Sequence, residues 1–325
     1  MIINDVCVLG GSGFVGAHVC EQLVERGYRV TVPTRDRERA KGLILLPTAE
    51  VMTADVHDAA TLQHLVSRCD AVVNLVGVLH GGRGKAGFDE AHIGLARKVV
   101  EACRKAGVRR LLHMSALNAD PKGPSEYLRS KGEAERVVRE SGLDFTIFRP
   151  SVVFGREDRF LNLFAKLQAL LPVMVLGSPT AKFQPIYVED VARVYAESLA
   201  RLESVGRSYD LVGPKVYTLR ELVEYAGERA GHRRPIIGLG PRLSYLQAAV
   251  MELMPGKLLT RDNVRSMSVD NVSSAPLPFG ITPTALEAVA PMWLARRTPR
   301  ERYNLFRDRS RSSVNSEWGM ENSER

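Results

Sequence analysis

Over the first 150 residues, short apolar runs alternate with longer stretches in which apolar residues recur every three or four positions. The runs predict strands at 5–9, 28–32, 50–53, 70–75, 110–114 and 145–148. The longer stretches predict helices at 13–26, 61–68, 89–106 and 125–140. Several strand candidates are apolar throughout, as a parallel sheet covered on both faces requires. The alternation therefore predicts an α/β fold with a doubly wound parallel sheet.

Beyond residue 150 the pattern loosens, and prolines separate helical stretches at 159–171, 188–202 and 219–230. We divide the chain into a sheet domain (1–155), a smaller C-terminal α/β lobe partly interleaved with that sheet (156–305), and a disordered basic and polar tail (306–325). The segment 243–254 is apolar almost all round. It is either a buried helix or a helix that docks on a membrane or a partner.

Composition and charge exclude several classes of protein. The chain has 325 residues, of which 45% are hydrophobic and 25% charged, so it is not disordered throughout. It contains no apolar run long enough to span a bilayer, and its start lacks a secretory signal. The four cysteines are scattered, which is typical of reduced thiols in a cytoplasmic protein.

The net charge of +8 is concentrated near the end of the chain, where residues 296–311 hold seven arginines against two acidic residues. Such a segment binds nucleic acid, an anionic membrane or an acidic partner, or it is simply solvated. Because no nucleic-acid-binding motif accompanies it, we do not expect nucleic acid as the partner. We predict a cytoplasmic location, with peripheral attachment to the inner face of the inner membrane as the second possibility.

The sequence GGSGFVG directly follows the first predicted strand and opens the first helix. One glycine allows the tight turn, the next lets a pyrophosphate approach the backbone, and the last lets helix and strand pack closely. The helix N-terminus then offers free N–H groups to the phosphates. The predicted contacts are Gly10, Ser12, Gly13, Phe14, Val15 and Gly16. This motif predicts a dinucleotide site in a Rossmann sheet.

Residues at the ends of the next strands indicate which nucleotide binds. Arg35 ends the second strand, where its guanidinium suits a 2′-phosphate, so we favour NADP(H) over NAD(H). Asp36 is a candidate helix cap. After the third strand, Asp55 and Val56 either contact the adenine or simply cap a turn. After the fourth, the backbone at Val76 and Gly77 is expected to pass along the cofactor ribose.

A Y-x-x-x-K motif, Tyr127 and Lys131, lies in the predicted helix 125–140, where residues four apart share a face. The ammonium is expected to lower the pKa of the phenol and to hold the nicotinamide ribose. Tyr127 would then serve as general acid or base toward a carbonyl or alcohol.

Together these motifs resemble the extended and atypical short-chain dehydrogenase/reductases. Further matching landmarks are Met114-Ser115-Ala116, Phe148-Arg149-Pro150 and Tyr187-Val188-Glu189-Asp190. Within that superfamily, the strings GREDRFLN (155–162) and TRDNV (260–264) are most similar to the NADPH-binding accessory subunit family of respiratory complex I and its bacterial relatives. The resemblance implies a catalytic role for Ser115, cofactor contacts at Pro150 and Val153, and a partner in a membrane-associated respiratory or quinone-synthesis complex.

One departure from the superfamily pattern affects the function. The hydroxyl that steadies the substrate oxygen usually lies at the position that Ala116 occupies here. Losing one such hydrogen bond costs roughly 10²–10³ in rate. We therefore weigh a nucleotide-binding accessory protein of complex I or quinone metabolism against an NADPH-dependent reductase, epimerase or dehydratase. The sequence predicts no metal site.

Overall fold

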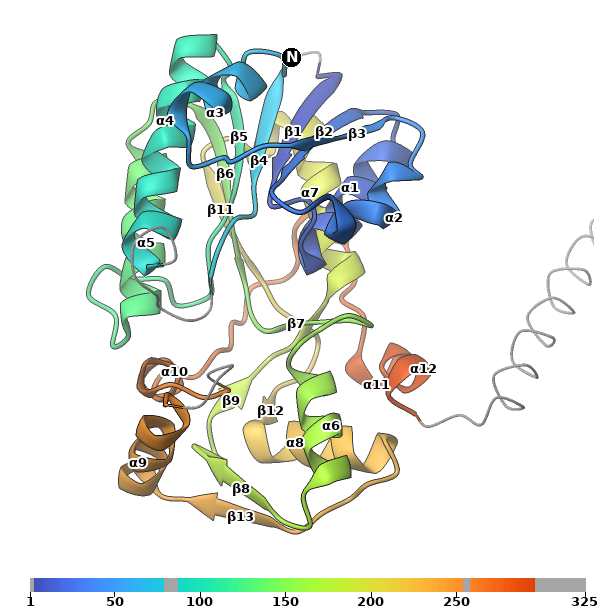
Figure 1. Cartoon of the computed structure of the whole chain (residues 1–325), viewed down its shortest axis with the longest axis vertical. Coiled ribbons are helices and arrows are strands. Elements are labelled where there is room, and N and C mark those ends of the chain that lie inside the picture. Colours follow the sequence, from blue (N-terminus) through green and yellow to red (C-terminus); the bar gives the residue numbers. More distant parts are fainter. Residues whose placement is uncertain (1–2, 79–86, 254–257, 296–325) are drawn as a thin grey trace, which may run out of the picture.

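The computed structural model describes residues 3–78, 87–253 and 258–295, and a parallel sheet forms its upper half in Figure 1. Seven strands of the described chain pair in the order β11-β6-β5-β4-β1-β2-β3, and every neighbouring pair is parallel. Their bounds are β1 (Asp5–Leu9), β2 (Arg29–Thr34), β3 (Ala49–Thr53), β4 (Ala71–Asn74), β5 (Arg110–Met114), β6 (Asp144–Pro150) and β11 (Arg207–Leu211). This order confirms the predicted doubly wound sheet.

Helices cover both faces of the sheet, as Figure 1 shows. One face packs on α1 (Phe14–Glu25), α2 (Lys41–Ile44) and α7 (Val188–Ala200), with Val19, Leu23 and Val191 in its core. The other packs on α3 (Ala59–Val66), α4 (Leu95–Ala106) and α5 (Glu126–Arg139), with Leu62, Leu95 and Val138. A π-turn, η3 (Asp89–Gly94), precedes α4. Burial on both faces explains why the strands are apolar throughout.

A second lobe forms the lower half of Figure 1 and encloses a separate apolar core around Phe154, Leu176 and Leu222. Its helices are α6 (Leu161–Leu170), α8 (Leu219–Arg229), α9 (Pro241–Met251), α10 (Arg261–Ser266), α11 (Leu286–Val289) and α12 (Pro291–Leu294). Its short strands are β7 (Val153–Phe154), β8 (Met174–Gly177), β9 (Lys182–Phe183), β10 (Ile186–Tyr187), β12 (Tyr217–Thr218) and β13 (Ile236–Leu239). Short 3-10 turns lie at η1 (Arg37–Ala40), η4 (Leu202–Ser204) and η5 (Pro278–Gly280).

The chain passes through this lobe and then returns to the large sheet. Helix α7 packs against α1, and β11 pairs with β6 as the last strand of the sheet. The sequence pattern predicts α7 but not β11, because Arg207, Ser208 and Asp210 interrupt the apolar run that marks a buried strand. An edge strand has one pairing partner and tolerates such polar residues.

Two predictions about side-chain burial have different outcomes. All four cysteines are buried and free of disulfides, which confirms the prediction of reduced thiols. The buried-helix interpretation of segment 243–254 is wrong for its described part, because α9 buries only Ser244 and Ala248. The predicted basic tail lies outside the described residues. In the described part of the chain, no helix is long and apolar enough to cross a bilayer.

A buried arginine joins β5, β6 and α7. Arg110 is 1% exposed, and its guanidinium donates to Asp144 O, Thr146 Oγ1, Ser198 O and Ser204 Oγ at 2.7–2.9 Å. Burial lowers its pKa to about 10, so it remains a cation at neutral pH. These bonds hold the end of α7 and the turn η4 against strands β5 and β6 of the sheet.

Replacing this buried cation tests its structural role. We expect Arg110→Met to lower the free energy of unfolding by about 2–4 kcal/mol, because its acceptors would be left buried and unpaired. The neighbouring Arg109→Met removes an exposed ion pair with Asp144, which contributes about 1 kcal/mol or less. Urea denaturation of both variants is the measurement, and equal losses would contradict the assigned role.

Candidate functional site

The glycine-rich turn lies at the carboxyl end of β1, where close backbone packing requires glycine. Gly10 has a φ of +82°, and a Cβ there would meet the Leu75–Val76 peptide at 3.1 Å. A Cβ on Gly16 would collide with the carbonyl oxygen of Gly10. Gly13 is the N-cap of α1 but offers no side-chain cap, so the first N–H groups of that helix face the site without one. Such a terminus suits phosphate.

The residues predicted to contact the adenosine part of the nucleotide lie at the ends of β2 and β3. The hydroxyls of Ser12 and Thr34 lie 3.1 Å apart and join the glycine-rich turn to β2. Arg35 is exposed, and no hydrogen bond or ion pair joins it to another residue in the described chain. Asp36 caps η1 by accepting from Glu38 N, which confirms the cap prediction. Asp55 accepts from His57 N, so the turn-capping alternative is realised there.

Lys131 is buried beside the backbone that follows β4. It is 4% exposed, and its Nζ donates to Met114 O at 3.1 Å, its one hydrogen-bond acceptor in the described residues. A Cβ added to Gly77 would lie 3.0 Å from this Nζ, so glycine leaves room for the ammonium. Burial lowers the pKa of Lys131 to about 8, although Glu135 opposes the shift. A desolvated ammonium with one acceptor retains donors for ribose hydroxyls.

Tyr127 lies one turn before Lys131 on α5, with its ring edge-on to Phe88 and His92 at 6.0 and 5.8 Å. Burial raises the pKa of its phenol to about 12. The sequence predicts the opposite shift, on the argument that the ammonium favours phenolate, and that prediction is wrong here because burial is the larger effect. Tyr127 therefore holds its proton at neutral pH, so it can donate a hydrogen bond or a proton but is not set to act as a base.

Two buried histidines, missed by the sequence analysis, complete the surroundings of Lys131. His92 Nε2 accepts from Val78 N at 3.1 Å, so its Nδ1–H faces Ser130 Oγ at 2.8 Å. Burial and Lys131 lower the pKa of His92 to about 2 and that of His113 to about 3. Both rings are therefore neutral, and Lys131 is the cation of the group. A lone histidine in a helix or strand gives no sequence signal for this role.

Two buried polar atoms at the end of β5 lack partners in the described residues. Ser115 is 2% exposed, and its Oγ has no hydrogen bond. His113 Nε2 is likewise unpartnered, while its Nδ1 faces the Asn74 amide at 3.3 Å. Ala116 beside them offers no hydroxyl. Buried unpaired groups are costly, and a ligand that bonds to them removes that cost. With the glycine cradle and the uncapped helix, they fit a nicotinamide dinucleotide.

The second lobe contributes to the helix that carries Tyr127. The carboxylate of Asp262, on α10, accepts from Glu126 N at 2.7 Å and from Tyr127 N at 3.1 Å. Ser266 Oγ lies 2.8 Å from Ser125 Oγ, the side-chain cap of α5. A carboxylate at a helix N-terminus is stabilised by the free N–H groups and the helix dipole. The TRDNV string therefore positions α5 from 136 residues away in the chain.

Other predicted residues have structural partners. In the GREDRFLN string, the buried carboxylate of Asp158 accepts from the N–H groups of Phe160 and Leu161 at 2.8 and 2.7 Å, which fixes the start of α6. Val76 N donates to the side chain of Asn74. Pro150 ends β6, and Val153 begins β7, which runs beside β10. The cofactor contacts predicted for Val56, Pro150 and Val153 therefore stay predictions.

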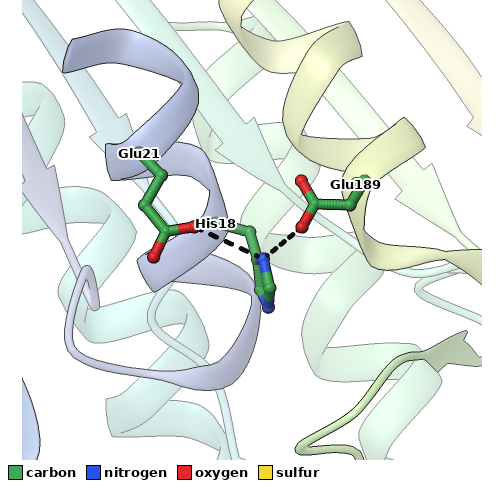
Figure 2. A group of neighbouring side chains, drawn as sticks. All are labelled: His18, Glu21 and Glu189. Atoms are coloured by element: carbon green, nitrogen blue, oxygen red, sulfur yellow. Dashed lines mark ion pairs between the residues drawn. The ribbon is translucent and has the colours of Figure 1, made fainter. Parts of the chain in front are cut away.

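A polar cluster of His18, Glu21 and Glu189 joins α1 to α7 (Figure 2). His18 Nδ1 lies 2.7 Å from a Glu189 oxygen and 3.7 Å from a Glu21 oxygen, and the donor atoms of the three lie within 4.8 Å. Burial lowers the pKa of His18, but the carboxylates, Glu189 foremost, outweigh it, so the net shift is upward. Protonated His18 thus strengthens the α1–α7 contact in acid, and this contribution is lost as pH rises through its raised pKa.

The fold and these residues define a dinucleotide-binding α/β protein with a Y-x-x-x-K helix. Residues 10–201 match the model of the NAD(P)H-binding family. The chain belongs to this family, as an atypical, extended member of the short-chain dehydrogenase/reductases.

The chain is also similar in sequence or fold to several known proteins. The chain is 33% identical, over 86% of its length and 77% of the relative, to the mitochondrial NADH dehydrogenase [ubiquinone] 1 alpha subcomplex subunit 9 of Rattus norvegicus. It is 32% identical to the ceramide reductase of Caulobacter vibrioides over 58% of each chain. The fold is similar to that of the Escherichia coli quinone oxidoreductase QOR2 with NADPH (TM-score 0.70, 19% identity, 89% and 99% coverage).

Lys131→Met is expected to change stability and nucleotide affinity in opposite directions. We expect the ligand-free variant to melt a few degrees higher than the wild type at pH 7, because a buried ammonium is replaced by an apolar chain of similar length. Its affinity for nucleotide should fall about 10- to 100-fold, the value of a charged hydrogen bond. Thermal melts and calorimetric titration with NADPH measure both effects.

The pH dependence provides a second readout of the same residue. Between the folded pKa of about 8 and the usual 10.5, unfolded chains bind more protons at Lys131 than folded ones. Wild-type stability therefore gains from this group as pH rises through that window, and the variant lacks the gain. The exposed Lys122→Met is the control. A variant that melts lower, or that binds NADPH like the wild type, would refute the assignment.

Proposed function

We propose that the protein holds NADPH as a resident ligand and serves as an accessory protein of respiratory complex I or of quinone metabolism. The observation that carries the ligand is the buried ammonium of Lys131 beside Gly77, with one acceptor in the described residues. Bound nucleotide would supply a hydride donor at its nicotinamide. The chain's own part is to hold the phosphates at the start of α1 and the ribose at Lys131 and Tyr127.

NADP(H) is favoured over NAD(H) by the end of β2. Exposed Arg35 supplies a planar cation at this position, where proteins that prefer NAD usually have a carboxylate. The carboxylate of the next residue, Asp36, is already engaged with Glu38 N and with Arg39. Arg35 is thus left to meet a 2′-phosphate.

The accessory role is supported by the relatives and by the tuning of the site. The subunit 9 relative aligns with 86% of this chain, so the likeness includes the second lobe as well as the nucleotide site. Ala116 supplies no hydroxyl, and Tyr127 is a weaker acid than free tyrosine. Both features reduce the stabilisation of a reacting oxygen but leave nucleotide binding intact. With this role we propose peripheral attachment at the inner face of the inner membrane.

A reductase acting on a small carbonyl or alcohol is the second candidate, and one observation favours it. Ser115 Oγ is buried next to Ala116 with no partner in the described residues, so it is available to a substrate oxygen. Tyr127 keeps its proton and would donate it as the carbonyl is reduced. Epimerase or dehydratase chemistry would require Tyr127 as a base, which its raised pKa disfavours.

Arg35→Ser tests the nucleotide preference. We expect the affinity for NADPH to fall about 10- to 100-fold, because a charge-assisted bond to the 2′-phosphate is lost, while the affinity for NADH stays unchanged. Calorimetric titration with each nucleotide is the measurement. The neighbouring exposed Arg37→Ser provides the control. Equal losses for both nucleotides in Arg35→Ser would show that Arg35 does not read the 2′-phosphate.

The accessory role is tested by purification without added nucleotide. We expect stoichiometric NADPH on the purified protein, negligible oxidation of it by quinones and small carbonyls, and co-fractionation with a membrane complex at low salt. Tyr127→Phe should leave co-fractionation unchanged. NADPH oxidised rapidly by a carbonyl, with turnover lost in Tyr127→Phe, would replace the accessory role by the reductase. A protein without bound nucleotide would contradict the resident-ligand proposal.

A further inference from the structure

The surface of the second lobe farthest from the large sheet carries an unusual number of exposed apolar side chains. Helix α9 presents Leu243, Leu246, Val250 and, just beyond its end, Leu253, at exposures of 56%, 59%, 57% and 87%. These positions follow one another by three or four residues, so they form one stripe along the helix. The opposite side of α9 buries Ser244 and Ala248 against the lobe. The apolar stripe therefore faces outward.

The small sheet formed by β8 and β13 lies next to α9 (Figure 1) and adds two more exposed apolar side chains. Val175 of β8 and Ile237 of β13 are register partners, so they lie side by side, and they are 48% and 55% exposed. The Gln247 side chain donates to Val175 O, which ties α9 to this sheet. We call Val175, Ile237, Leu243, Leu246 and Val250 the α9 face. An exposed apolar surface of this extent marks an interaction site.

The charges around the α9 face indicate its partner. The described residues between 231 and 267 include five basic and two acidic residues. Both acidic groups are engaged, since Glu252 pairs with Arg261 and Asp262 accepts from the backbone of α5. The guanidinium of Arg265 lies over the ring of Tyr245, and exposed Arg242 starts α9. The apolar stripe is thus bordered by cations, with no unengaged carboxylate in the described part of this region.

We propose that the α9 face binds the surface of an anionic lipid bilayer, with α9 lying in the plane of the interface. Its leucine and valine side chains would enter the headgroup–acyl boundary, and the arginines at its border would meet lipid phosphates. The stripe contains aliphatic residues, whereas protein interfaces favour aromatic residues and Met. A lipid surface therefore fits better than a protein partner. The inference deepens the proposed membrane-peripheral role by naming the surface that carries it.

Vesicle flotation of the full chain tests this inference. The vesicles contain phosphatidylcholine and phosphatidylglycerol, with pure phosphatidylcholine as the neutral comparison. We expect wild-type protein to float with the anionic vesicles at low salt, and Leu243→Ser, Leu246→Ser and Val250→Ser combined to reduce the partition coefficient about tenfold or more. Arg242→Gln should reduce the preference for anionic over neutral vesicles.

The matched control changes two leucines and a valine that are exposed elsewhere, as Leu45→Ser, Leu202→Ser and Val216→Ser combined. Retained NADPH binding verifies the fold of each variant. Wild-type protein that ignores anionic vesicles would overturn the inference, and so would equal flotation of both triple variants. A dimer that the α9 variant alone abolishes, with flotation unchanged, would show an interface between copies. Vesicle binding without association to a respiratory complex would remove the accessory role and leave this inference standing.

Discussion

The site depends on one constraint, the burial of an ammonium group in an environment poor in acceptors. Lys131 bonds to Met114 O, and Glu135, the carboxylate that acts on it electrostatically, is bonded to Arg149 at 2.7 and 2.5 Å. The histidines beside it remain neutral, since a second buried cation there would be costly. Gly77 gives the ammonium space. Such a group destabilises the ligand-free fold and is compensated by a ligand rich in hydroxyls, so stability and binding oppose each other at this residue.

The nucleotide site and the outer surface of the lobe are connected through α10. This helix caps α5 with Asp262, next to Tyr127, while its Arg265 bonds to Tyr245 of α9 at 2.9 Å. A change in the position of α9 would therefore act on the start of α5 through a few polar contacts. Through Asp262, the lobe thus helps to position the helix that carries Tyr127 and Lys131.

The sequence correctly predicted the features that depend on residues close together in the chain. The glycine spacing predicted the β1–α1 turn because Gly13 and Gly16 pack against the Gly10 carbonyl within that turn, and the apolar runs predicted strands β1 to β6. The predictions that were wrong or absent depend on distant parts of the chain. Strand β11 is polar because it lies at the edge, the shift of the Tyr127 pKa follows from burial, and Asp262 reaches α5 from another lobe. In α9, composition alone does not distinguish an apolar side that faces inward from one that faces outward.

The polar groups of the site bear differently on nucleotide binding and on catalysis. The groups that we propose to bind the nucleotide are fixed by their neighbours: Lys131 by Met114, the start of α5 by Asp262, and the glycine-rich turn by Thr34. The groups that would speed a reaction are poorly suited to it. The pKa of the Tyr127 phenol is raised to about 12, and Ala116 has a methyl group where a catalytic hydroxyl is expected. General acid catalysis works best when the pKa of the acid lies near the working pH. This arrangement supports the proposed role, in which the nucleotide stays bound and is not turned over rapidly, and the Ser115 hydroxyl, unpaired in the described residues, is the feature through which slow chemistry would remain open.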